Sequence, residues 1–583
     1  MTKIKNQEKW DLDKIYPSFH VWNQEYDYLK ERIDKYKIYK NNVKDKLFES
    51  LTELIDLERI ISKLYVYAKM NYDLDSLNEG NNELLNKINN LLDLFSSQTN
   101  FFELEVLKIT DKDLNELYSK DSQLNEYEYL IEKIRAEKKH FLSEKEENIL
   151  SLSSSIRDTN SKVFAKLNDT DCYFGMIDNQ ELTHGNYSNF IRHHDQNIRK
   201  KAFTLYHEYY QKIQNALSEC LISEVKNNIF IANIRKYKDP LAMYLNADKV
   251  DPKIYTNLIK NVKKNIPLFN EYLNLKKDEL GLKKLHMYDL YTPLNPSSTK
   301  EYTYEEAKYL VLESLKVMGD EYYNIAKGGL NDHWVDVYPS KGKTSGAYSF
   351  GHYETKPYIL MNFNKTLNSV ETLAHELGHS MHSYYSREYN PYHYSDYSIF
   401  VAEIASNTHE LLLFDYLLKT SQDKNMKKTI IETILESFKG SIFRQTQFAE
   451  FEKELHDKEF NGEVLTNNKL LNIYAKINED YYGKVVVQDE LIKYEALRIP
   501  HFYSSFYVYK YALGLAVAYV FASRIINKED KAVENYLNFL KSGSKKYPLE
   551  VLKDAGIDLV NQDIISEALV LFKNYIEEYK KLI

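Results

Sequence analysis

The chain has 583 residues, and 77 Lys and Arg against 86 Asp and Glu give a formal net charge of −9. This mildly acidic total argues against a general nucleic-acid-binding protein, which needs a basic surface, and 43% hydrophobic residues exclude a disordered chain. Gly (17) and Pro (11) are scarce. Because these two residues interrupt helices, the composition predicts a mainly α-helical protein.

The first half of the chain alternates between helical and irregular patterns. Residues 1–155 carry leucine and isoleucine at helical spacing, as in Leu47–Leu57, which predicts long amphipathic helices. Residues 161–190 consist of short apolar runs separated by Asp, Asn and Gly, which predicts a small β-hairpin region. The helical pattern returns over residues 196–280.

The second half contains one extended region inside a helical sequence. Residues 338–363 hold two short apolar runs around a polar turn, which predicts two strands. After residue 366 nearly all of the chain has helical periodicity. The pattern therefore predicts a small sheet placed beside the helix that starts near residue 367.

That helix contains the sequence His375-Glu376-Leu-Gly-His379. Two histidines four residues apart lie on one helical face, about 6 Å apart along the axis, so both imidazoles can bind one Zn²⁺. Glu376 is placed to take a proton from zinc-bound water. The alternative is a surface helix with two solvent-facing histidines, but the apolar stripe of this helix argues against it. The motif predicts a zinc peptidase with Glu376 as general base.

A catalytic zinc site needs a third protein ligand. His382 lies seven residues after His375, about 10 Å along the axis, which is too far for three imidazoles to converge easily on one metal. We therefore predict that Glu403, at the start of the next helix, is the third ligand and that His382 lies in the second shell or the pocket. A surface salt bridge is the alternative role for Glu403.

Two further polar residues share the helical face of Glu403. Ser406 and Glu410 follow three and seven residues later. A zinc-bound histidine normally donates its other N–H to a carboxylate or carbonyl, and Glu410 is a candidate acceptor. An ordinary solvated glutamate is the equally simple alternative.

The densest cluster of His and Tyr residues lies at 498–514 and includes His501, Tyr507 and Tyr511. Phenol O–H and imidazole N–H groups are suitable donors to the oxyanion that forms during peptide hydrolysis. Tyr507 and Tyr511 are four residues apart, which would place them on one face of a helix. A buried aromatic stripe is the alternative in such a tyrosine-rich chain.

The sequence also predicts a compartment. The N-terminus lacks the apolar segment of a secretory signal, and the most apolar stretch, Leu513–Ala522, is far shorter than the roughly 20 residues that span a bilayer. The two cysteines form no CxxC pair. We predict a cytoplasmic protein without membrane or nucleic-acid partners.

Together these segments resemble the oligoendopeptidase F branch of the thimet-oligopeptidase-like zinc peptidases. The resemblance rests on the following stretches: Trp10–Tyr16, His286–Tyr291, His375–His382, Ala402–Ser406 with Glu410, Ile499–Tyr503 and Phe506–Tyr511. It covers nearly the whole chain. In the wider family the last segment is rich in glycine, whereas here Phe502-Tyr-Ser-Ser-Phe506 takes the place of the glycines.

The resemblance implies an all-helical, two-lobed fold around a deep channel, with a small β-sheet beside the metal helix. It implies an N-terminal helical lobe with a small β region at 1–195, forming part of the channel wall, and a catalytic zinc-peptidase domain at 196–583. One Zn²⁺ per chain would be held by His375, His379 and Glu403, although some family descriptions give the position of His382 as the third ligand. His501 and Tyr507 would bind the transition state, with Tyr511 a further candidate.

The expected substrates are short unstructured oligopeptides, cleaved internally. The segment containing Gly346, Ala347 and Tyr348 would pair with the substrate backbone as an added β-strand. A dipeptidyl carboxypeptidase using Arg498 as a clamp for the substrate terminus is one alternative, and a non-catalytic peptide-binding protein is another. The oligomeric state, monomer or small homo-oligomer, stays open.

Overall fold

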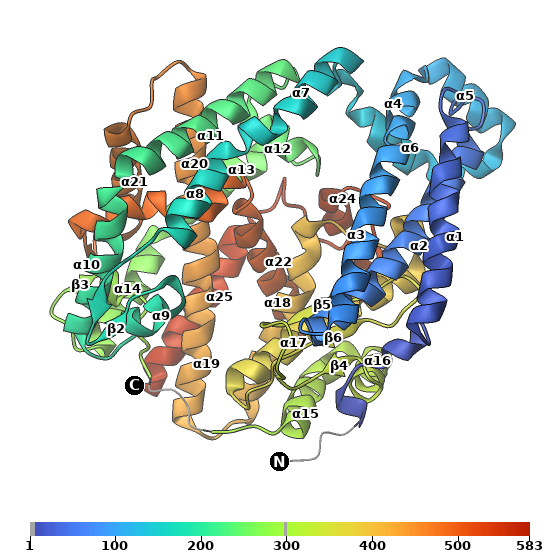
Figure 1. The fold of residues 1–583 in the computed structure, drawn as a ribbon. Helices are drawn as coiled ribbons and strands as arrows, with labels where there is room; N and C mark the ends of the chain where they lie inside the picture. Colours follow the sequence, from blue (N-terminus) through green and yellow to red (C-terminus); the bar gives the residue numbers. More distant parts are fainter. Residues whose placement is uncertain (1–5, 296–299) are drawn as a thin grey trace. The chain divides into compact units, whose positions relative to one another are not determined.

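The computed structural model describes residues 6–295 and 300–583, and almost all of its ribbon is helical (Figure 1). Helices hold 72% of the residues and strands 3%, which confirms the mainly α prediction. No helix in the described part of the chain is both long and apolar enough to cross a bilayer.

The chain forms two compact units that alternate along the sequence. The first contains the described chain up to Lys139, Lys300–Lys419 and Phe521–Gly556, and the second contains the remaining segments. The predicted boundary at residue 195 does not coincide with an end of either unit. The division of roles between residues 1–195 and 196–583 stays a prediction.

The first unit carries the metal helix and the N-terminal helices. Its elements are α1 (Phe19–Tyr36), α2 (Leu47–Leu74), α3 (Glu79–Thr99), α4 (Phe101–Lys108), α5 (Asp111–Lys120), α6 (Glu128–Ala136), α15 (Tyr304–Leu315), α16 (Asp320–Asn331), β4 (Val335–Asp336), β5 (Tyr348–Phe350), β6 (Tyr358–Leu360), α17 (Leu367–Tyr389), α18 (Ile399–Thr420), α23 (Ala532–Lys541) and α24 (Pro548–Asp554).

The second unit carries the His/Tyr segment. Its elements are α7 (Glu144–Arg157), α8 (Thr159–Ala165), β1 (Met176–Ile177), β2 (Gln180–Glu181), α9 (His184–Ile191), α10 (Gln196–Lys212), α11 (Gln214–Ile234), α12 (Pro240–Asn246), α13 (Pro252–Lys264), α14 (Ile266–Glu279), β3 (Leu285–His286), α19 (Lys424–Ser437), α20 (Arg444–Phe460), α21 (Asn467–Tyr482), β7 (Val486–Val487) and α25 (Ile564–Leu582). Helix α22 (Tyr509–Ile526) starts in this unit and ends in the first.

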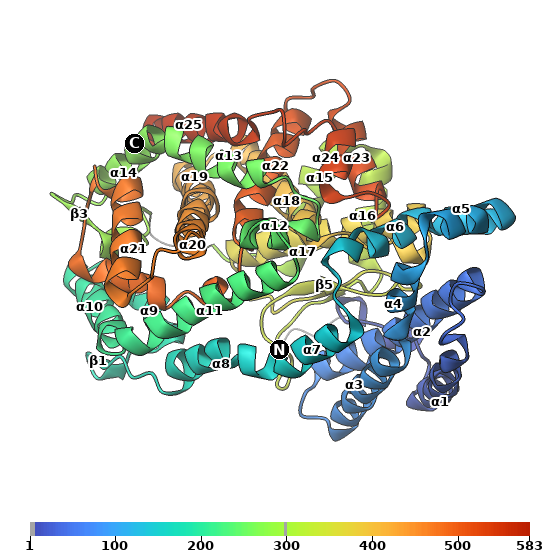
Figure 2. The same ribbon diagram turned by 90° about the horizontal axis from the view of Figure 1, so that it is seen from above.

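The N-terminal helices pack as the leucine pattern predicts. Along α2, Leu47, Leu51 and Leu57 are buried, and along α3, Leu84 and Ile88 are buried. Helices α1, α2 and α3 lie side by side in both views (Figures 1 and 2). The apolar core that they form continues onto strand β6, so it supports the sheet beside the metal helix.

The three-stranded sheet has the order β4-β6-β5, with β4 parallel and β5 antiparallel to β6. The Trp10 indole N–H donates to the carbonyls of Trp334 (3.1 Å) and Ile359 (3.0 Å), which ties the N-terminal segment to the sheet. Strand β5 is at the edge, and its Ser349 hydroxyl lies 2.8 Å from the Ser380 hydroxyl of α17. A small sheet therefore lies beside the metal helix, as predicted.

The region predicted as a β-hairpin is only partly extended. Strands β1 and β2 pair through Met176↔Glu181 and Ile177↔Gln180. The apolar run Val163–Leu167, however, is helical, in α8 and the π-helical turn that follows it. A short apolar run has no periodicity of its own, and packing of α8 against α11 stabilises the helix here.

Candidate metal centre and active site

Helix α17 presents its polar motif on the side opposite to an apolar stripe. Thr366 caps its N-terminus by accepting the Ser369 N–H. The buried apolar side is made by Val370, Leu373, Leu377 and Met381. His375 and His379 remain partly exposed, so the helix is held by its apolar side and both imidazoles are accessible.

The two histidines and Glu403 form a compact group of ligand atoms. Glu403 Oε2 lies 3.4 Å from His375 Nε2 and 3.5 Å from His379 Nε2. Ligands bound tetrahedrally to zinc at about 2.1 Å lie roughly 3.4 Å from one another. Within the described chain they form the one group of His, Cys, Asp or Glu side chains that could hold a metal ion. The role of Glu403 as third ligand stays a prediction.

Two of the residues predicted around the metal, Glu410 and Ser406, contact side chains of the candidate ligands. Glu410 Oε1 is 2.6 Å from His375 Nδ1, so it can accept the second N–H of that imidazole. The Ser406 hydroxyl donates to Glu403 Oε2 at 3.1 Å and to the Glu403 carbonyl at 3.0 Å. Both contacts fix the orientation of a ligand side chain.

Helices α17 and α18 cross closely at Gly378, and both ribbons lie together in Figures 1 and 2. A Cβ atom at Gly378 would lie 2.6 Å from Ser406 Cα and 2.7 Å from the Ala405 carbonyl oxygen. Only glycine fits at this crossing. The glycine in the metal motif therefore lets α18 approach near enough to supply Glu403.

Glu376 is a buried carboxylate beside the metal ligands. It is 6% exposed, and its Oε2 has no hydrogen-bond partner among the described residues. Burial raises its pKa, while the charges of His375 and His379 and a hydrogen bond from the Ser349 backbone lower it. An unpartnered buried oxygen is costly, and it is available here for a proton-transfer role.

The charges within the ligand group are strongly coupled. Burial lowers the pKa of His375, but hydrogen bonds with Glu403 and Glu410 outweigh this and raise it to about 10. Hydrogen bonds with His375 and His379 hold the pKa of Glu403 far below its usual range. The site thus combines carboxylates with imidazoles, the donor set of a divalent metal.

His382 occupies an apolar position. Its ring stacks on Tyr397 with centroids 3.6 Å apart and lies 4.9 Å from Phe539. It is 1% exposed, and burial lowers its pKa to about 3. His382 is outside the group of His375, His379 and Glu403, and its role in the second shell or the pocket stays a prediction.

Strand β5 and the turn before it contain the residues predicted to bind the substrate backbone. Gly346 has φ +85°, and its carbonyl accepts the Asn362 side-chain N–H at 2.8 Å. Ala347 and Tyr348 are half-buried. The strand pairs with β6 on one side only, so its other edge is unpaired within the sheet.

His501, Tyr507 and Tyr511 belong to the second unit and lie close to one another. The Tyr511 ring centroid is 5.3 Å from that of Tyr507 and 5.8 Å from that of His501. The prediction that Tyr507 and Tyr511 share one helix is wrong, because α22 begins at Tyr509. Phe506 has φ +55°, a left-handed conformation that interrupts a right-handed helix before Tyr507.

Sequence analysis missed several residues that shape these regions. In the first unit, Ser380 and Asp73 contact β5 or the turn before it. In the second, Glu452 accepts the Phe506 N–H at 2.7 Å and Asn228 donates to the Ser505 hydroxyl at 2.7 Å. Ser380 could have been found, since it lies four residues after Glu376 on the same helical face. Isolated polar residues such as Asp73 carry no such signal.

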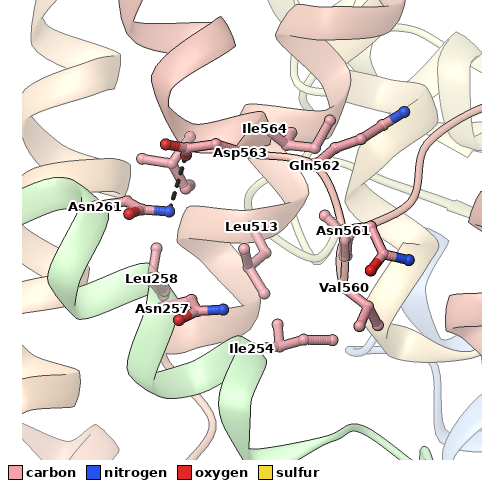
Figure 3. A pocket seen from close by; sticks show the side chains of 12 residues that line it. Ile254, Asn257, Leu258, Asn261, Leu513, Val560, Asn561, Gln562, Asp563 and Ile564 are labelled. Atoms are coloured by element: carbon pink, nitrogen blue, oxygen red, sulfur yellow. Dashed lines mark hydrogen bonds between the residues drawn. The ribbon is translucent and has the colours of Figure 1, made fainter.

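A separate cavity of about 230 Å³ lies in the second unit (Figure 3). It is lined by apolar residues including Ile254, Leu258 and Leu513, with amide side chains at its edge. Its one carboxylate, Asp563, already accepts hydrogen bonds from Asn261 (2.9 Å) and the Ser566 N–H (3.0 Å). We assign no chemistry to this cavity.

Comparisons with known proteins identify the family. The family model described as peptidase family M3 matches residues 189–571, and the model described as oligopeptidase F matches residues 105–174. The chain belongs to peptidase family M3. As a member of its oligoendopeptidase F branch it is a metalloendopeptidase.

Individual relatives cover the whole chain. Oligopeptidase PepF of Bacillus subtilis is 40% identical, over 100% of this chain and 88% of that protein. Group B oligopeptidase PepB of Streptococcus agalactiae is 38% identical, over 100% and 98%. The crystal structure of oligoendopeptidase-F from Enterococcus faecium is similar with a TM-score of 0.75 and 32% identity, covering 96% of this chain and 98% of that one. The M3 fold therefore extends over the full length.

Proposed function

We propose that this M3 peptidase is a zinc-dependent endopeptidase that hydrolyses internal bonds of short, unstructured oligopeptides, with one Zn²⁺ per chain. The chemistry of the donor set supports zinc: His375, His379 and Glu403 provide two nitrogens and one oxygen, and the oxygen lies 3.4 and 3.5 Å from the two nitrogens. When bound there, zinc would lower the pKa of a water and polarise the scissile carbonyl. Names of relatives such as oligopeptidase PepF support oligopeptides as the substrate class.

Glu376 is the proposed general base. Its buried, unpartnered Oε2 is the observation that carries this proposal. This oxygen takes a proton from the attacking water and later delivers it to the leaving amine nitrogen. The nearby Ser349 backbone favours the charged form of this carboxylate.

The remaining residues bind and orient the peptide. The free edge of β5 pairs with the extended substrate backbone, which leaves side-chain preference broad because backbone pairing carries no sequence information. His501 and Tyr507 donate hydrogen bonds to the oxyanion, and Tyr511 is a further candidate donor. These last roles rest on the sequence resemblance and on the clustering of the three rings within the second unit.

The exopeptidase alternative depends on Arg498 as a clamp for the substrate carboxylate. Arg498 Nη2 already donates to Glu495 at 2.7 Å, so its guanidinium has an internal partner. This supports the endopeptidase proposal. A cytoplasmic location stays a prediction from the sequence.

The test uses a peptide of about ten residues, blocked at both ends and internally quenched, an extended length of roughly 33 Å. Wild-type protein should cleave it internally, a chelator should abolish cleavage, and Glu376→Gln should lower kcat by at least about 10³-fold with metal content unchanged. Cleavage of unblocked peptides alone would favour the exopeptidase. Full activity of Glu376→Gln would overturn the proposed base.

A further inference from the structure

The C-terminal end of α2 binds the chain segment that leads into β5. The Thr344 N–H donates to the Asp73 carbonyl at 2.8 Å, and the Ser76 N–H donates to the Gly342 carbonyl at 2.9 Å. The Ser76 hydroxyl donates to the same carbonyl, also at 2.9 Å. Helix α2 thus holds the turn before β5, which lies roughly 270 residues later in the sequence.

The Asp73 carboxylate is the centre of this contact. Tyr348 O–H donates to Oδ2 at 2.7 Å, and Thr344 O–H donates to Oδ1 at 2.8 Å. Lys69 Nζ donates to both oxygens, at 2.5 and 2.6 Å. Asp73 is 1% exposed, and hydrogen bonds to a buried charged group are among the stronger ones in proteins. Its loss would release Tyr348 and Thr344 together.

The opposite end of the contact reaches the catalytic helix. Ser349, next to Tyr348, is held by the Ser380 hydroxyl of α17 at 2.8 Å, and its backbone hydrogen bonds to Glu376. Strand β5 is therefore fixed by α17 at Ser349 and by α2 at Tyr348. The contact at Ser349 lies next to the proposed general base. The contact at Tyr348 lies at the turn and strand edge where the substrate backbone is proposed to pair.

We propose that Asp73 is a positioning residue for substrate binding: it holds Thr344 and Tyr348 so that the free edge of β5 is set for an extended peptide. The proposal rests on the proposed function, since it takes β5 as the substrate-pairing strand. It assigns to α2 a part in peptide recognition. Because Ser349 is held separately by Ser380, losing Asp73 affects KM more than kcat.

The test compares Asp73→Asn, Tyr348→Phe and the double variant with wild type on the blocked peptide. Each single variant should raise KM roughly tenfold, the effect of one hydrogen bond to a charged group, with kcat changed less than threefold. The KM changes of the two single variants should not add up in the double variant, because both changes act on the same hydrogen bond. Hydrogen exchange in a peptide covering residues 344–350 should become faster in all three.

Tyr16→Phe is the matched control. Tyr16, like Tyr348, is a tyrosine of the first unit whose hydroxyl donates to a carboxylate, here that of Glu25, and its hydrogen bond and ring contacts involve Glu25, Tyr67 and Lys63 and not residues 342–350. It should lower thermal stability without changing KM or the exchange of residues 344–350. If Asp73→Asn does not fold, Tyr348→Phe decides, since it keeps Asp73 with Lys69 and Thr344.

Two outcomes overturn the inference and one concerns the proposed function. A KM within twofold of wild type in Tyr348→Phe, or a KM change equal to that of Tyr16→Phe, would show that Asp73 is purely structural. Cleavage of the blocked peptide that persists with a chelator, or its absence in wild type, would instead show that the proposed function is wrong. An inactive Glu376→Gln together with unchanged KM in Tyr348→Phe would reject the role of Asp73 alone.

Discussion

Helices α17 and α18 bring His375, His379 and Glu403 together through contact between two regular helices, whereas the segment 504–508, just before α22, is irregular. At the helix crossing the deciding feature is the absence of a side chain at Gly378. In the irregular segment the deciding features are buried polar side chains from other helices. One region is shaped by close packing and the other by hydrogen bonds.

The contacts of the irregular segment come from α11 and α20. Glu452 accepts the Phe506 N–H, and Asn228 donates to the Ser505 hydroxyl. Asn228 is itself held by Tyr244, whose hydroxyl donates to Asn228 Oδ1 at 2.8 Å. Because Phe506 has φ +55°, a conformation costly for a residue with a side chain, these contacts maintain a backbone turn that the local sequence does not favour.

The largest expected effect comes from filling the helix crossing. In Gly378→Ala the new Cβ would lie 2.6 Å from Ser406 Cα, so α18 must move and Glu403 with it. We expect peptidase activity to fall more than about 100-fold and the free energy of unfolding to fall by roughly 1–3 kcal/mol, as for overpacked sites. Peptide cleavage measures the first effect and chemical unfolding the second, and metal content shows whether the loss of activity comes from loss of the metal.

Gly328→Ala is the control for this substitution. Gly328 lies inside α16, and a Cβ there meets no atom within 4 Å. This variant should be as stable as wild type or more so, since alanine favours helices over glycine by roughly 1 kcal/mol. Normal metal binding by Gly378→Ala would show that the crossing tolerates a methyl group.

A smaller effect is expected at the second contact of His375. Glu410→Gln replaces the carboxylate that lies 2.6 Å from His375 Nδ1 with a neutral amide. Loss of such partners typically weakens metal binding 10- to 100-fold. Competition with a chelator measures the affinity, and Glu479→Gln, at an exposed position on α21, should leave it unchanged. Equal metal affinities in the two variants would mean that Glu410 does not strengthen metal binding by His375.

The same contrast explains what could be predicted from the sequence. Helical periodicity and the spacing of His375, Glu376 and His379 follow from one helix, so the sequence predicts them directly. The rise of the helix between His375 and His382 was the reason to predict Glu403, and not His382, as the third metal ligand. The conformation at Phe506 could not be predicted, because it depends on Glu452 and Asn228, which lie 54 and 278 residues earlier in the sequence. Such isolated polar residues show no pattern that marks their partners. The role of Asp73 was missed for the same reason.

The smallest expected effect on peptidase activity is at Glu452, which acts on how stability depends on pH. Burial raises the pKa of this carboxyl from 4.5 to about 8, although the Phe506 N–H lowers it in part. Between these values the folded protein binds a proton that the unfolded chain releases, so this contribution is fully present below about pH 4.5 and is lost as the pH rises through 8. In the folded protein the neighbouring Tyr244 and Tyr255 have raised pKa values and His456 has one lowered to about 4, so none of these three changes charge there between pH 5 and 8. His456 still titrates in the unfolded chain, but it does so equally in wild type and in a Glu452 variant.

Glu452→Gln removes this titration and keeps the side chain's size. Urea unfolding at pH 5 and pH 8 should show that wild type loses more stability across this interval than the variant does. Glu432→Gln is the control, because Glu432 also accepts backbone N–H groups in the second unit, from Leu294 and Asn295. A wild-type slope no steeper than that of Glu452→Gln would mean that the turn at Phe506 is held by packing, as the helix crossing at Gly378 is, and the difference between the two regions would disappear.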